Sequence, residues 1–505
     1  MSEEKKEIIE QAQSGKPAGG SGGPGGRPGG PGGAPKPMTT TGKVGLVVGI
    51  ALCLIIWLLP PFWGLEAGGQ HFLAILAMCI TFWLTLPFPA ELTALLLMIL
   101  PWLFGLVDAG LAFSGWTSRT TWFIFGALLI GKIVSTTGLD KRIAYNLLSK
   151  MGRFGSSYYG ILLSILIIAF LATFLIPSGT VMTTLLCALF FPFITAFGVD
   201  KKSNIGKAFM MIIPIIVIIN GRMFLTGSNY NMVVHGILAE TGQTISWLSW
   251  FLSMMPAALL MCFVVYGMFR MTIKPEVANI PGGAEMFKKQ AKELGPISTN
   301  EKKGAALFLL AMVLWVTGDL THISVNVVAV GVAILAMLPG VGVMGFREGI
   351  MKSNWPMIIF TAAVMGLPRV MGTLGVSAAF DSAFSMVSGS ITTPFIFILV
   401  MWLLTQIGGW LGLGLAIAPL FLPVLMPVAS SLGMPMATVV FMNTLMAPIV
   451  LFYHAPHPLI AASYDTFEQR DFAKYGFIVS LLWVPVCIFM YYVWWPLMVN
   501  FGFIY

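Results

Sequence analysis

A polar stretch at residues 220–231 carries the side chains best suited to bind a solute in this sequence of 505 residues. It directly follows an apolar segment, IIPIIVII, and a short apolar run, MVV, resumes after it. Hydroxyl and amide side chains, together with backbone groups released where a helix is interrupted, can hold a small ion or solute. The stretch contains Asn220, Gly221, Arg222, Thr226, Gly227, Ser228, Asn229, Tyr230 and Asn231.

We expect residues 212–235 to form a helix that is interrupted inside a membrane and supplies half of a solute site. The residues expected to contact the solute are Gly227, Ser228, Asn229 and Asn231. A polar turn at the protein surface is the alternative interpretation. Arg222 either pairs with the solute or extends toward the lipid headgroups.

A second stretch, from Asn443 to Asp465, has the same character. Its helix runs into Pro448 and is followed by His454-Ala455-Pro456-His457-Pro458. Proline removes a backbone donor and clashes with a continuing helix, so a second interruption is expected here. The residues expected to contact the solute are Ala455, Pro456 and His457. The two histidines either couple a proton or form hydrogen bonds at a helix end.

The composition places these stretches in a membrane protein. Hydrophobic residues make up 57% of the chain and charged residues only 10%, against about 25% in soluble domains. The net charge of +8 comes mostly from Lys and Arg in connecting loops. Such cations set the orientation of the spans in the membrane, so they do not indicate a nucleic-acid partner. The acidic residues after residue 303 are scattered, and no phosphate-binding Gly-Lys-Ser/Thr motif is present, which argues against an enzyme or a nucleotide-driven pump.

We therefore predict an all-α polytopic membrane protein with about 11 to 13 transmembrane segments. Residues 1–42 are rich in Gly and Pro and should form a disordered cytoplasmic tail. A first transmembrane repeat at 43–269 and a second at 304–505 flank a basic linker at 270–303, which belongs in the cytoplasm. This topology places the N-terminus in the cytoplasm and the C-terminus outside the cell.

The two halves resemble each other, which predicts inverted repeats. Segments 121–136, with Lys132, and 355–376, with Arg369, are short and interrupted; we expect the first to be a re-entrant hairpin rather than an ordinary span. In each half, an apolar span with a small-polar interruption then leads to Pro192 or Pro423. The site residues expected at these interruptions are Ser178, Gly179, Thr180, Gly408 and Gly409, with Ser178 matched to Gly409 by counting back from the prolines. Ser178 and Thr180 could instead cap the following helix.

The chain resembles the divalent anion–sodium symporter family over nearly all of its length after residue 43. The resemblance is carried by NGRMFLTGSNYNMVV with TISWLSWF, by APLFLPVL, and by HAPHPLI with RDFAKYGFIVSLLW. The family carries Ser-Asn-Thr at each hairpin tip, whereas this chain has Pro177-Ser178-Gly179-Thr180 at the first and glycines around Gly409 at the second. The resemblance thus implies the family scaffold, with a weakened set of side chains for sodium.

What the resemblance implies is a secondary transporter, in the cell membrane, that moves a small anion by alternating access as a homodimer. A di- or tricarboxylate is the expected solute, an inorganic oxyanion or ion exchanger is the alternative, and a membrane-embedded enzyme is a remote one. No cofactor is expected, and Na⁺ is a candidate coupling ion with reduced or absent dependence. The implied ion-binding positions are Ser178, Thr180, Gly221, Gly227, Asn231 and Gly409.

Overall fold

The computed structural model describes residues 38–504 except 63, 151–153, 155, 175, 177, 280–294, 352, 380–381, 383–390, 411–413, 415–416 and 449–454. Pro177 and His454 therefore lie outside the described residues. So do most of the expected tail at 1–42 and much of the linker at 270–303. Eight described helices are long and apolar enough to cross a membrane, and six shorter apolar helices accompany them. The prediction of an all-α, multi-pass membrane protein is confirmed.

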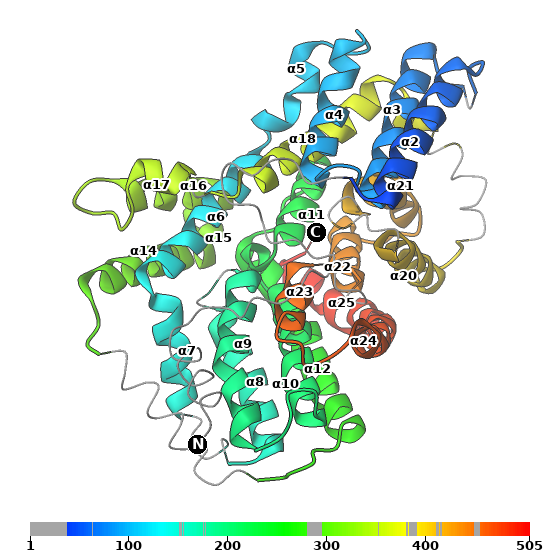
Figure 1. Ribbon diagram of the computed structural model, residues 1–505. Helices are drawn as coiled ribbons and strands as arrows, with labels where there is room; N and C mark the ends of the chain where they lie inside the picture. The colour runs from blue at the N-terminus through cyan, green and yellow to red at the C-terminus, as the bar shows by residue number, and fades with distance from the viewer. Residues whose placement is uncertain are drawn as a thin grey trace. The chain divides into compact units, whose positions relative to one another are not determined.

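One set of helices, which we call the outer group, packs around α6 and α18 (Figure 1). Within it, Gly126 of α6 lies against the backbone of Ala329 in α16, and Gly115 lies against the carbonyl of Ala362 in α18. Small residues allow such close approach between helices in membranes. The outer group contains α2 (Thr40–Leu58), α3 (Ala67–Thr85), α4 (Ala90–Leu103), α5 (Ala109–Ala112), η1 (Ser114–Thr117), α6 (Arg119–Thr137), α14 (Thr299–Val316), α15 (Gly318–Thr321), α16 (Val325–Met337), α17 (Phe346–Met351) and α18 (Trp355–Thr373).

The remaining helices form the inner group: α8, α9, α12 and α23 pack against α10, the most buried of the long apolar helices described, and α11, α20, α21 and α24 pack against α22. Short α7 (Leu139–Lys150) connects the two groups. The inner group contains α8 (Tyr158–Thr173), α9 (Gly179–Ala196), α10 (Asn204–Gly221), η3 (Leu225–Gly227), α11 (Asn229–Glu240), α12 (Trp247–Thr272), α20 (Pro394–Trp410), α21 (Ile417–Ser431), α22 (Met436–Met446), α23 (Pro456–Ala462), α24 (Gln469–Phe489), η6 (Met490–Trp494) and α25 (Trp495–Asn500).

The re-entrant hairpin expected at 121–136 is wrong. That segment lies within α6, a single helix of 19 residues, and the segment expected to be interrupted at 355–376 is largely the single helix α18, with Pro368 inside it. Glycine, proline and a long cation are tolerated in such helices because neighbouring helices support them. The helical hairpins are instead the packed pairs α8–α9 and α20–α21.

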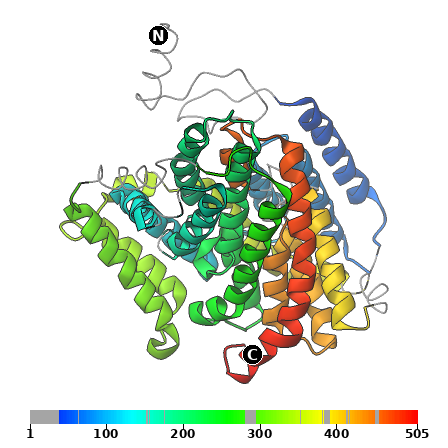
Figure 2. The ribbon, with the colours of Figure 1, turned by 90° about the horizontal axis from the view of Figure 1, so that it is seen from below.

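Two tryptophans fasten the end of the chain to its first half. Pro256 in α12 has no N–H, so the carbonyl of Leu252, one turn earlier, lacks its helical donor. Trp494 donates its indole N–H to this carbonyl at 3.0 Å, and Trp495 donates to Ser253 at 3.0 Å. Trp494 is the last residue of the π-helical turn Met490–Trp494, and Trp495 is the first residue of α25. Figure 2 shows α24, in red, running beside α12, in green.

Arg142 and Glu301 join α7 to the start of α14. The Arg142 guanidinium donates to both carboxylate oxygens, at 2.6 and 3.1 Å, and the Ser298 N–H donates to the same carboxylate at 2.6 Å. These bonds, first that from Arg142 and then that from Ser298, lower the pKa of Glu301 from 4.5 to about 2. A carboxyl whose pKa is depressed by folding stabilises the folded state above its unfolded pKa.

We predict that this stability is lost as the pH falls from about 4.5 toward 2, because protonation removes the bonds to Arg142. Glu301→Gln should cost about 1–3 kcal/mol near neutral pH, the range for hydrogen bonds to charged groups. Thermal unfolding of the purified protein in detergent between pH 5 and pH 3 checks this. A wild-type curve parallel to that of Glu301→Gln across this range would contradict it.

Candidate solute site

The first interruption separates α10 from α11, as the sequence predicts. The helix ends at Gly221, and α11 begins at Asn229 after a short 3₁₀ turn. The Asn231 side-chain amide donates to the carbonyls of Gly221 at 2.8 Å and Phe224 at 2.7 Å. Gly227 lies so close to the Gly221 carbonyl that a β-carbon there would overlap it. The freed carbonyls are thus satisfied from within the interruption itself.

The second interruption follows α22, which ends at Met446, and precedes α23, which begins at Pro456. Here the helix-end carbonyls receive donors from elsewhere in the chain. Arg222 donates from its guanidinium to the carbonyls of Leu445 and Ala447, and Gln406 donates to that of Met446 at 2.9 Å. Arg222 therefore neither extends to the membrane surface nor points freely into a cavity: it connects the two interruptions.

The tip of the α8–α9 hairpin contacts both interruptions. Phe174 packs edge-on against Phe224 of the first interruption, with ring centroids 4.7 Å apart. Gly179 faces His457 at the start of α23 so closely that a β-carbon would overlap the imidazole. Ser178 accepts a hydrogen bond from the Val181 N–H, so its capping role is observed. The hairpin tip is therefore held between the residues that the sequence assigns to the site.

The α20–α21 hairpin contacts the second interruption. Gly409 lies against Pro448, and a β-carbon at Gly409 would overlap the pyrrolidine ring. The sequence alignment that pairs Ser178 with Gly409 is wrong: Ser178 precedes the second helix of its hairpin, whereas Gly409 lies in the first helix of the other. Tyr230 adds a direct link between the halves by donating to Asn443 at 2.6 Å.

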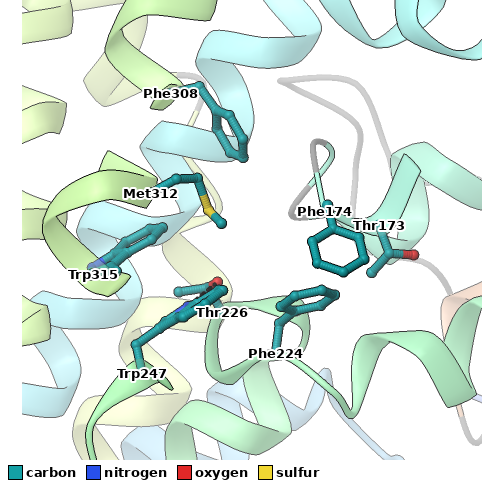
Figure 3. A pocket seen from close by; sticks show the side chains of 9 residues that line it. Thr173, Phe174, Phe224, Thr226, Trp247, Phe308, Met312 and Trp315 are labelled. Carbon is teal, nitrogen blue, oxygen red and sulfur yellow. Dashed lines mark hydrogen bonds between the residues drawn. The ribbon is translucent and has the colours of Figure 1, made fainter. Parts of the chain in front are cut away.

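A narrow crevice opens where the first hairpin tip meets the first interruption (Figure 3). Its volume of about 10 Å³ holds roughly one water molecule. Trp247 donates its indole N–H to the Thr226 hydroxyl at 3.2 Å on one side. The lining residues are Thr173, Phe174, Phe224, Thr226, Gly227, Trp247, Phe308, Met312 and Trp315. A solute the size of a carboxylate enters here only if the aromatic side chains move.

A larger cleft of about 660 Å³ lies between α11, α18, α21 and α22. Arg369 of α18 and Glu240 of α11, which lines the cleft, form an ion pair with Nη2 and Oε2 3.0 Å apart. Arg369 therefore joins α18 to α11 beside the cleft. The cleft is lined by Ile237, Glu240, Thr241, Pro368, Pro423, Met426, Pro427, Ser430, Ser431 and Met436. It lies between the inner and outer groups.

The predicted site residues thus form one neighbourhood, although their contacts with a solute stay predictions. Gly221, Gly227, Ser228 and Asn231 lie at the first interruption; Gly409 and His457 contact the second; and Ser178 with Gly179 lies at the first hairpin tip. Sequence reasoning missed the role of Tyr230. Its position in the polar stretch 220–231 was the available signal.

Two interrupted helices, each packed against a helical hairpin inside a multi-pass membrane protein, define the fold of a secondary transporter. The chain belongs to the sodium:sulfate symporter transmembrane region family, whose model matches residues 40–501. The resemblance noted from the sequence is thereby confirmed.

Its curated relatives include named transporters. A putative malate transporter of Bacillus subtilis is 26% identical over 68% of this chain and 73% of its own length. Dicarboxylate transporter 1 of Spinacia oleracea chloroplasts is 25% identical over 89% of this chain and 80% of its own length. An L-tartrate/succinate antiporter of Shigella flexneri is 23% identical over 88% of this chain and 96% of its own length.

We predict that Gly409→Ala lowers the melting temperature, because the new methyl group must displace Pro448 from the second interruption. The cost expected for overpacking is about 1–3 kcal/mol. Gly331→Ala, in helix α16 with open space around it, is the matched control and should leave stability unchanged or slightly raised. Equal melting temperatures for both variants in detergent would show that the contact contributes nothing.

Proposed function

We propose that this protein transports small carboxylates, most of all dicarboxylates, across the cell membrane by alternating access. The observation that carries the proposal is the junction of both interruptions with the first hairpin tip. Ser178 and Ser228 cap helices α9 and α11 there, so two positive helix ends lie at this junction. Helix N-termini favour carboxylate groups, and the names of the relatives refer to malate, dicarboxylate and tartrate/succinate.

The charge around the junction also suits an anion. Arg222 is buried and forms hydrogen bonds to carbonyls, and residues 205–235 and 436–462 contain no Asp or Glu. A positive charge without a nearby carboxylate partner raises the electrostatic potential for an incoming anion. The relevant solute contacts in this proposal come from Ser178, Thr180, Ser228, Asn229 and His457.

Alternating access needs one part of the molecule to move against another. The cleft of about 660 Å³ between α18 of the outer group and α11, α21 and α22 of the inner group supplies room for such movement. The crevice beside Phe174 is too small for a carboxylate, so it serves as a closed gate in this proposal. The proposal includes three further points. The protein acts as a transporter and not as an enzyme, and it forms a homodimer in the inner membrane. Its N-terminus lies in the cytoplasm and its C-terminus lies outside the cell.

An inorganic oxyanion is the second candidate solute, since the family model itself is described by sodium and sulfate. Uptake into proteoliposomes separates the two candidates. A panel of malate, succinate, tartrate, citrate, lactate, sulfate and phosphate should show saturable uptake of a dicarboxylate. Uptake of sulfate alone would replace the dicarboxylate by the oxyanion, and uptake of no anion in the panel would reject the proposed function.

We predict that Asn229→Ala raises the KM for the transported dicarboxylate about 10-fold or more, the loss expected for a hydrogen bond to a charged group. Asn229 is half-buried at the start of α11, and its side chain forms no hydrogen bond with another described residue. Its removal should therefore leave the melting temperature unchanged. Asn146→Ala, on the exposed side of α7, is the control. An unchanged KM in Asn229→Ala would remove this residue from the site.

A further inference from the structure

Arg222 is the most deeply buried cation among the described residues that line the two interruptions, and its side chain is 4% exposed. Its guanidinium donates from Nη1 to the Leu445 carbonyl and from Nη2 to the Ala447 carbonyl at 2.5 Å. The same group lies over the Trp483 ring, 4.9 Å from the centroid. Trp250 fixes its backbone by donating to the Arg222 carbonyl at 3.2 Å. The cation is thus held in one place by four neighbours.

The charge of Arg222 is partly offset by the end of a helix and is not paired with a carboxylate. Arg222 forms no ion pair with a described residue, and the neighbouring segments 205–235 and 436–462 carry no acidic residue. The C-terminal end of α22 carries the negative pole of the helix dipole. A buried charge needs such compensation, because burial without it costs several kcal/mol. Arg222 and the end of α22 therefore form one electrostatic unit.

Three carbonyls at this helix end already have donors from outside the helix. Arg222 takes those of Leu445 and Ala447, and Gln406 takes that of Met446 at 2.9 Å. Carbonyls at unwound helix ends are the groups that coordinate a free Na⁺ in transporters with interrupted helices. A free cation at this position would have to displace the guanidinium, and the two positive charges would repel each other.

We propose that Arg222 is a tethered cation that permanently occupies the cation position at the end of α22, so that the carbonyls of Leu445 and Ala447 take no free monovalent cation. The inference rests on the proposed function, since it concerns how the same solute site is supplied with positive charge. The first interruption differs, because the neutral Asn231 amide satisfies its carbonyls. The fixed charge therefore belongs to one half of the site only.

For transport, this means that the positive charge at the end of α22 is part of the protein. It does not have to be supplied by a cation that binds from solution. Removing it should expose the carbonyls of Leu445 and Ala447 to a free cation. A variant that lacks the charge should therefore show a larger response to Na⁺ than the wild type. A variant that keeps a positive charge should not gain that response.

The test compares Arg222→Gln, which loses the charge, with Arg222→Lys, which keeps it. Melting temperatures of the purified proteins are measured in NaCl and in choline chloride at equal ionic strength, without any carboxylate. Arg222→Gln should melt below the wild type and gain about 2 °C from Na⁺ relative to the wild type, as expected for a ligand that binds only the folded state. Arg222→Lys and the control Arg369→Gln should respond to Na⁺ as the wild type does.

Three outcomes overturn the inference: Arg222→Gln responds to Na⁺ no more than the wild type does, Arg222→Lys responds as strongly as Arg222→Gln, or neither variant folds. The last outcome would mean that a positive charge alone is not enough and that the guanidinium shape is required. Recovery of folded Arg222→Gln by Na⁺, but not by choline, would instead support the inference. Because these melting experiments use no carboxylate, they stand even if uptake assays reject the proposed function.

Discussion

The structure depends on one constraint: a helix that stops inside an apolar protein leaves backbone carbonyls that must find hydrogen-bond donors. Two helices stop in this way, after Gly221 and after Met446. The donors at the first end come from Asn231 nearby, and those at the second come from Arg222 and Gln406 across the fold. Satisfying these carbonyls draws the two halves of the chain together at the place where a solute would bind.

The same constraint explains the position of the hairpins. The tip of α8–α9 and the end of α20 each supply glycine at the point of contact, Gly179 against His457 and Gly409 against Pro448. Any larger residue would push the hairpin away from the interruption and leave a void or an exposed backbone group. Gly409 therefore has a packing role that is visible in the structure.

Much of this arrangement could be predicted from the sequence. Apolar length gave the spans, and the polar residues at 220–231 and the prolines around Pro456 marked both interruptions. The hairpins were misplaced because Lys132 and Arg369 looked costly inside a helix, whereas α6 and α18 accept them within continuous helices. The partner of Arg222 could not be predicted, because its acceptors are backbone carbonyls 223 and 225 residues away, which leave no side-chain signature. The inverted relation of the two repeats stays a prediction.

The pair of indole bonds from Trp494 and Trp495 to α12 has a mechanical consequence. Adjacent residues donate to adjacent carbonyls, so the seam cannot slip along its axis without breaking both bonds together. Pro256 leaves the Leu252 carbonyl without its helical donor, and this carbonyl is therefore free to accept the indole N–H of Trp494. Helix α12 and helix α25 should therefore move as one unit, because neither can slide past the other while both bonds hold.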